Sequence, residues 1–179
     1  VRREQYREAW GRDSADLQEY DYFVRGHELY LRFTQKDNEA AGAIWREGLA
    51  KFPDSPILQA KLGWYHLQRT YAFFEGDPND YVVARRLVQS ALARPAISPL
   101  ARRVALWLSA YVSAQAGEFD RALREAALVD ALAPFDPFGQ GDLGSVYIMA
   151  GQPEEALVRL RKSIAADPNN RAFYQQLEG

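Results

Sequence analysis

Histidines and clustered acidic residues are the side chains in this sequence that suit acid–base or metal chemistry. The two histidines are His27 and His66, and neither has a second ligand at a spacing that zinc sites use. The run 77–80 lacks the glycine and final glutamate of an EF-hand loop, so Asp80 is predicted to be a helix N-cap. Since no phosphate-binding glycine loop or Gly-x-Ser-x-Gly turn occurs either, we expect no catalysis, metal or cofactor, and a structural role for His66.

Composition excludes several classes of protein. Hydrophobic residues make up 47% of the 179 positions and aromatic residues 13%, which indicates a folded chain. The formal net charge of −2 argues against a nucleic-acid binder. The longest apolar run, 104–112, is about half of a membrane span, so no membrane insertion is expected. Without cysteine the compartment stays open between cytoplasm and periplasm.

Alanine and proline recur at a fixed distance along the chain. Three pairs are separated by twelve residues, and the last two pairs are offset by 34 residues: Ala41/Pro53, Ala122/Pro134 and Ala156/Pro168. A further copy begins at Ala84, and small residues precede the four alanines at Gly26, Gly63, Ala110 and Gly144. Such a period predicts a chain of similar supersecondary units.

Each copy contains two segments with apolar residues at helical spacing. In the last copy these residues are Ala156, Leu157, Leu160 and Ile164. Small residues allow the two helices to approach closely, and the proline ends the second helix. A single hairpin cannot bury its apolar face, so stacking of neighbouring hairpins is expected. No stretch sustains the alternation of a strand.

These positions resemble tetratricopeptide (TPR) repeats, most clearly at Leu143, Gly144, Tyr147, Ala156 and Pro168. The resemblance implies an all-α fold, a right-handed α-solenoid of about four helix hairpins. The expected boundaries are an N-terminal helix and linker at 1–15, and an array at 16–179 made of repeats 16–55, 56–98, 99–136 and 137–170 with a capping helix at 171–179. Gln140 departs from the pattern, which has an apolar residue there.

The second copy has nine residues more than the usual twelve between Gly63 and Ala84, and this surplus lies near the segment 71–78. In one interpretation the first helix of that copy continues to Phe74, Gly76 ends it, and the rings pack on the neighbouring hairpin. In the other, the segment forms a lid or a protein contact. The third copy has four additional residues, about one helical turn.

The resemblance also implies a concave surface lined by first helices. Its binding residues would be Phe23, His27, Tyr30, Trp64, Trp107 and Tyr111. Aromatic side chains there suit an apolar or aromatic anchor of a peptide, although the same rings would serve equally well as packing between helices. TPR co-chaperones bind a terminal carboxylate with lysine and asparagine side chains in this groove. Here Trp64 and Tyr111 stand in place of the asparagines, and Phe23 and Trp107 stand in place of the lysines. Binding of a terminal carboxylate is therefore not expected.

The predicted function is therefore a scaffold without catalysis that binds a protein or peptide. A narrower resemblance concerns Tyr20, Asp21, Arg25 and Gly26, which are similar to the entry of TPR regions in bacterial class III adenylate/guanylate cyclases. It implies a regulatory or assembly segment of a bacterial signalling protein, with any cyclase activity outside this chain. Because the chain begins with Val1, we expect a fragment of a longer protein. The alternative is homo-oligomerisation, such as a homodimer, through the terminal helices.

Overall fold

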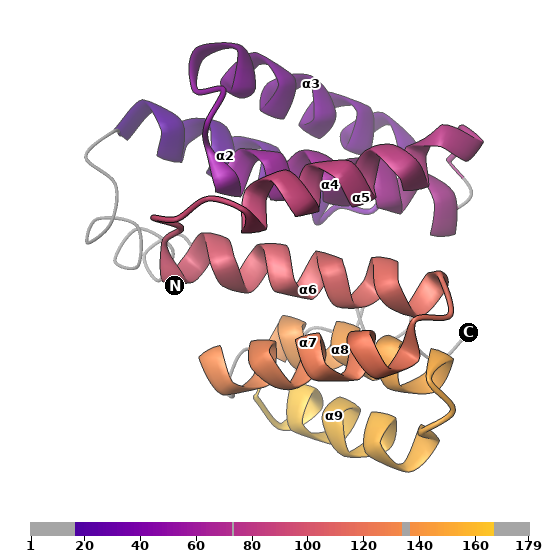
Figure 1. Cartoon of the computed structure of the whole chain (residues 1–179). Coiled ribbons are helices and arrows are strands. Elements are labelled where there is room, and N and C mark those ends of the chain that lie inside the picture. Colours follow the sequence, from indigo (N-terminus) through magenta and orange to yellow (C-terminus); the bar gives the residue numbers. More distant parts are fainter. Residues whose placement is uncertain (1–16, 73, 134–136, 167–179) are drawn as a thin grey trace. The chain divides into compact units, whose positions relative to one another are not determined.

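The fold consists of helices throughout the part of the chain that the structure describes. A computed structural model describes residues 17–72, 74–133 and 137–166, and no strand occurs among them. The helices shown in Figure 1 are α2 (Leu17–Tyr30), α3 (Gln35–Lys51), α4 (Pro56–Tyr71), α5 (Pro78–Leu92), α6 (Pro99–Gln115), α7 (Phe119–Leu132), α8 (Pro137–Met149) and α9 (Pro153–Ala166).

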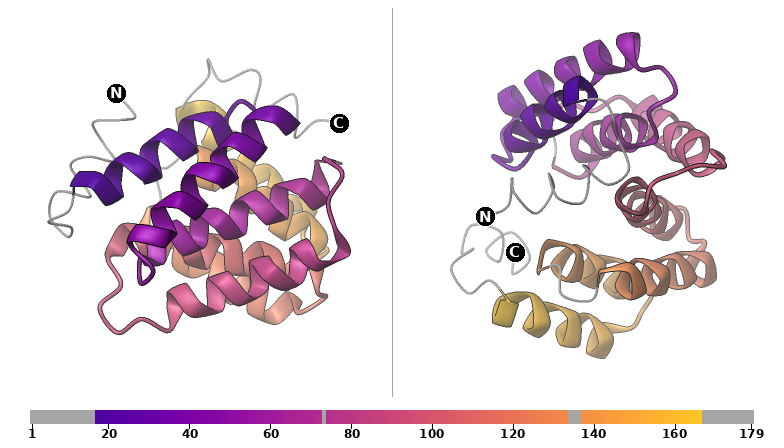
Figure 2. Two further views of the ribbon diagram at one scale, coloured as in Figure 1. Left: turned by 90° about the horizontal axis from the view of Figure 1, so that it is seen from above. Right: turned by 90° about the vertical axis from the view of Figure 1, so that its left-hand side faces the viewer.

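Consecutive helices form hairpins. Helix α2 packs on α3, α4 packs on α5, and α8 packs on α9 (Figure 2). Contacts between α3 and α4 and between α7 and α8 join one hairpin to the next. The predicted all-α fold of successive hairpins is confirmed, with two helices in each of the four expected segments. The first helices differ in length: α2 has 14 residues, α4 has 16, α6 has 17 and α8 has 13.

The chain divides into two compact units, Val1–Ala105 and Leu106–Gly179. The boundary falls inside α6, because each half of this helix contacts its own unit. In unit 1, the Trp64 indole Nε1 donates to the Val104 carbonyl at 3.4 Å. In unit 2, the Ser109 hydroxyl donates to Glu125 at 2.8 Å. The expected helices at 1–15 and 171–179 lie outside the described residues.

Small residues stand where large rings cross between helices. The alanines of the repeat, at 41, 84, 122 and 156, are all buried. A Cβ on Gly26 would lie 2.2 Å from the Trp45 Nε1 atom, and one on Gly42 would lie 2.6 Å from the Tyr65 ring. The sequence therefore allows α2 to touch the indole of α3, and α3 to touch the phenol of α4.

Side chains cap the first turns of α3, α4, α5 and α6, the last through Ser98, which accepts from the Ala101 amide. Thr34 accepts from the Asp37 amide, and Ser55 accepts from the Leu58 amide. The predicted N-cap role of Asp80 is wrong. Asp77 is the N-cap of α5, and Asp80 stands three residues later, where its carboxylate accepts from the Asp77 amide at 2.7 Å. The two residues form a capping box, which satisfies two backbone donors at once.

The predicted extension of the second copy's first helix to Phe74 is also wrong. Helix α4 ends at Tyr71, and the Phe74 amide bonds back to the Arg69 carbonyl at 3.2 Å. A Cβ on Gly76 would lie 2.8 Å from that same carbonyl, so the chain folds back tightly over the last turn of the helix.

Rings of this segment pack as the first interpretation of 71–78 predicts. Phe33, in the turn of the first hairpin, lies 6.0 Å from the Tyr71 ring and 5.9 Å from the Phe74 ring. The hydroxyls of Tyr30 and Tyr71 are 3.2 Å apart. These contacts join the segment 71–78, called the insertion below, to the neighbouring hairpin. Phe73 lies outside the described residues.

Replacement of Gly26 by alanine tests the close helix approach. We expect Gly26→Ala to lower the free energy of unfolding by about 1–3 kcal/mol, because the added methyl group collides with a buried indole. Gly144→Ala is the matched control, since its Cβ would meet only a carbonyl oxygen at 3.5 Å and alanine favours a helix over glycine. Urea unfolding followed by circular dichroism measures both; equal midpoints would contradict the assignment.

Candidate functional site

Three residues of α2 form a stack of rings in unit 1. Phe23, His27 and Tyr30 follow one another at helical spacing, which places them on one face. The Phe23 and His27 rings are 5.7 Å apart with 14° between their planes, and the His27 and Tyr30 rings are 6.4 Å apart with 21°. Phe23 is completely buried, whereas His27 and Tyr30 are half-buried. Only the second half of the stack is therefore open to a ligand.

A lysine from α4 completes this group. The Lys61 ammonium lies 3.2 Å from His27 Nδ1, and it stands 5.6 Å and 5.9 Å from the centres of the Phe23 and Tyr30 rings. Lys61 is only 4% exposed. Aromatic faces stabilise a cation at such distances. Lys61 was not predicted from the sequence to belong to the site. The feature that could have indicated it is its position two residues before Gly63, one of the repeated small residues.

Trp64 lies inside unit 1. It is 4% exposed, and its indole donates to the Val104 carbonyl. The expectation that Phe23 and Trp64 line an open groove is therefore corrected: both rings fill space between helices, as the alternative interpretation of the aromatic residues proposed. The physical reason is coverage by neighbouring helices, which enclose these two rings completely or almost completely.

Trp107 and Tyr111 belong to the part of α6 in unit 2, and both are half-buried. Burial raises the pKa of Tyr111 to about 12, the negative charge of Asp142 acts in the same direction, and a hydrogen bond with Ser145 opposes them. Asp142 and Ser145 lie on α8. The structure thus brings these two α8 side chains to Tyr111, and the phenol stays neutral at physiological pH.

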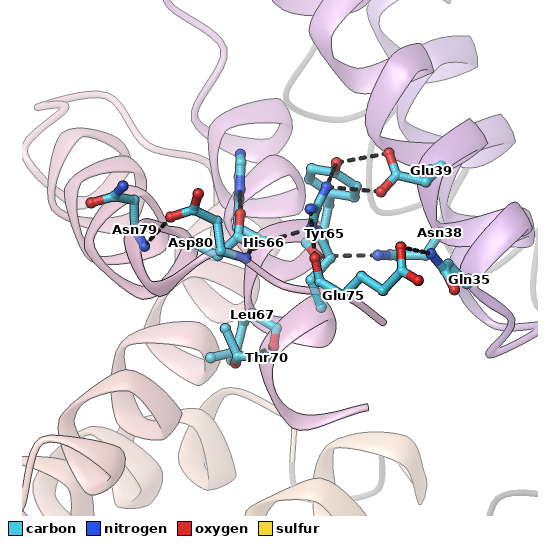
Figure 3. Close-up of polar contacts among 12 residues, drawn as sticks. Gln35, Asn38, Glu39, Tyr65, His66, Leu67, Thr70, Glu75, Asn79 and Asp80 are labelled. Carbon is cyan, nitrogen blue, oxygen red and sulfur yellow. Dashed lines mark hydrogen bonds and ion pairs between the residues drawn. The ribbon is translucent and has the colours of Figure 1, made fainter. Parts of the chain in front are cut away.

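A polar network surrounds the insertion of unit 1 (Figure 3). Asp80 is 5% exposed, and its carboxylate lies 2.5 Å from His66 Nδ1 and 3.0 Å from Arg69 Nε. Arg69 also donates to Glu39 at 2.8 Å and to the Tyr65 hydroxyl at 2.7 Å. A buried carboxylate needs such partners to remain charged. The network ties α3, α4 and α5 together.

Two hydroxyl groups of α4 make hydrogen bonds near this network. The Tyr65 hydroxyl donates to Glu39 at 2.9 Å, and the Thr70 hydroxyl donates to the Leu67 carbonyl at 2.7 Å. Both hydroxyls are used in structural bonds (Figure 3). His66 has 18% of its side chain exposed, so its half-buried position agrees with the structural role expected for it.

The departure from the repeat pattern at Gln140 has a physical explanation. Gln140 is 2% exposed, and its amide donates to Asp130, which also accepts from Arg159. Arg159 donates in turn to the Tyr147 hydroxyl at 3.2 Å and covers that ring. An apolar residue at 140 could not partner this carboxylate, so the polar side chain belongs to a network that joins α7, α8 and α9.

Among residues 17–72, 74–133 and 137–166, no group of three or more histidine, aspartate or glutamate side chains could hold a metal ion. Within the same ranges, no helix combines the length and apolar character needed to cross a bilayer.

At acidic pH, protonation of Asp130 should lower the free energy of unfolding of unit 2. Burial alone would raise the pKa of Asp130, but hydrogen bonds from Arg159 and Gln140 outweigh it and lower the pKa. The stabilisation is therefore complete above the unfolded pKa, about 3.9, and is lost as the pH falls through the lower folded value. Urea midpoints measured from neutral to acidic pH should fall less steeply for Asp130→Asn than for the wild type; parallel curves would exclude this contribution.

No protein-family model matches the chain, and no curated protein matches it.

Proposed function

We propose that this chain is a TPR-like interaction module that binds a protein or peptide and has no catalytic role of its own. The observation that carries the proposal is the set of half-buried aromatic side chains on first helices, namely His27 and Tyr30 in unit 1 and Trp107 and Tyr111 in unit 2. Rigid rings held by packed helices bind a partner at low entropic cost. Aromatic residues also dominate the energetics of interfaces.

Each unit supports the proposal with its own chemistry. In unit 1, the half-buried His27 and Tyr30 rings are held against the Lys61 ammonium, which is itself buried, so a ligand would meet the aromatic surface. In unit 2, the negative charge of Asp142 acts on the Tyr111 phenol. The two surfaces would therefore favour different side chains of a partner.

The parent protein is, in our narrower proposal, a bacterial class III adenylate/guanylate cyclase that uses this segment for regulation or assembly. Its basis is the short element containing Tyr20, Asp21, Arg25 and Gly26. The structure gives these residues local roles as well: Asp21 pairs with Arg25 at 3.2 Å, and Gly26 makes room for Trp45. The flanking reading frame decides this proposal, because a cyclase requires metal-binding aspartates in a further domain.

A random peptide library displayed on phage tests the binding function. We expect the chain to enrich a family of peptides whose affinity falls about tenfold with His27→Ala or Tyr111→Leu, the cost of removing one well-packed contact. Lys36→Ala, on the exposed first turn of α3, is the control and should bind as the wild type does. Absence of enrichment, or equal binding by all four proteins, would contradict the proposal.

Homo-oligomerisation is a second candidate, favoured by apolar side chains on α9. Leu157 is 52% exposed and Ile164 is 39% exposed, and their spacing of seven residues places them on one helix face. Exposed end faces of helical repeats need a covering partner.

Light scattering over a range of protein concentrations tests this second candidate. We expect the mass of the wild type to rise with concentration, because burial of the α9 face favours association. The double variant Leu157→Ser, Ile164→Ser should remain monomeric. Leu128→Ser, at a residue of α7 that is 53% exposed, is the control. A wild-type mass that stays monomeric at every concentration would exclude the candidate.

A further inference from the structure

Charge is distributed unevenly along the chain. Residues 81–117 contain five arginines, at positions 85, 86, 94, 102 and 103, and no aspartate, glutamate, lysine or histidine. The whole chain has 22 lysines and arginines, so the 17 that remain elsewhere are outnumbered by the 24 acidic residues. Helices α5 and α6 and the turn between them therefore form a positively charged stretch in a chain that is otherwise negative.

Two of these arginines are exposed and have no carboxylate partner in the described part of the chain, namely Arg86 on α5 and Arg102 on α6. Arg94, in the turn, pairs with Asp54 at 2.5 Å. The charge of Arg86 is thus offered to solvent without a carboxylate in direct contact.

Arg86 lies on the side of α5 that faces away from α4. Asp80 contacts His66 of α4, and Ala84 and Val88, at helical spacing from Asp80, are buried. Arg86 follows Ala84 by two residues, which turns it by about 200° around the helix axis. Its guanidinium group is therefore directed to the outside of the hairpin that α4 and α5 form.

Val82 and Gln89 lie on the same outer side, about one turn before and one turn after Arg86. Val82 is 51% exposed, and Gln89 is exposed as well. These three side chains are called the α5 outer face below. They offer a ligand an apolar contact, an amide and a positive charge next to one another on one rigid helix.

We infer that the α5 outer face binds an acidic segment of a partner protein, with one carboxylate paired to Arg86 and an adjacent apolar side chain on Val82. The inference rests on the proposed interaction function and names the class of partner. The planar guanidinium suits a carboxylate, because it donates two parallel hydrogen bonds. Charge complementarity selects this occupant, since α5 beyond Asp80 and all of α6 contain no acidic residue that would repel it.

A short acidic segment fits this face better than nucleic acid does. The phosphates of an extended nucleic acid require several cations along their path, and outside residues 81–117 they would meet the negative remainder of the chain. A few residues with one carboxylate and one apolar side chain match the face of a single helix.

Titration of the isotope-labelled chain with short peptides tests the inference by NMR. Three capped peptides of the same length carry one central leucine, and glycine alternates in them with glutamate, glutamine or lysine. We expect the glutamate peptide to give saturable shifts centred on residues 82–89, and the other two to give none there. High salt should weaken the binding, because an exposed ion pair is screened.

Two charge reversals separate the site from the overall charge. Arg86→Glu should weaken binding of the glutamate peptide about tenfold, because repulsion replaces an exposed ion pair. Arg124→Glu, at an exposed residue of α7 in unit 2, should leave binding within about twofold. Glutamate favours a helix at both exposed positions, so the fold is kept. Val82→Ser should weaken binding about threefold through the lost apolar contact.

The inference is overturned if the glutamate peptide does not saturate, if wild type and Arg86→Glu bind it equally, or if the lysine peptide saturates at the same residues. Tighter binding of a thymidine oligonucleotide at residues 82–89 would overturn it too, because nucleic acid would then be the occupant. Failure of the interaction function itself is a different result. A library peptide that depends on His27, in a protein that does not bind the glutamate peptide, would retain the function and reject the acidic partner.

Discussion

Close approach of helices through residues without bulk is the constraint on which the hairpins of unit 1 depend. Gly26 lies under the Trp45 indole and Gly42 under the Tyr65 ring, at distances where a single methyl group would collide. The buried indole also donates to the Phe23 carbonyl at 3.4 Å. Since this contact fixes α2 against α3, it also fixes the stacked rings of α2 that are offered to a ligand.

Polar networks connect neighbouring helices at places where the repeat pattern would use apolar contacts. Asp80 in unit 1 and Asp130 in unit 2 each accept from an arginine and from a second side chain. Such networks are geometrically demanding, because removal of one partner leaves a buried group unsatisfied. They therefore specify one register of neighbouring helices more strictly than aliphatic packing does. This strictness suits a scaffold whose exposed rings must keep fixed positions.

Sequence reasoning was successful where one residue type has one physical role. The repeated alanines and prolines predicted the eight described helices and their pairing, because small residues mark helix contacts and proline ends helices. It failed where two residues could share a role. Asp77 and Asp80 both suit an N-cap, and only the folded chain shows that Asp80 turns instead to His66 and Arg69. The superhelical hand of the array stays a prediction.

Burial of the aromatic residues could not be predicted for a related reason. Phe23 and His27 stand one turn apart on the same face, yet the first is completely buried and the second is half-buried. Helical spacing assigns a face but does not say how far a neighbouring helix covers it. The position of Lys61 could not be predicted either, because helical spacing does not show that a charged residue of α4 contacts the stacked rings of α2.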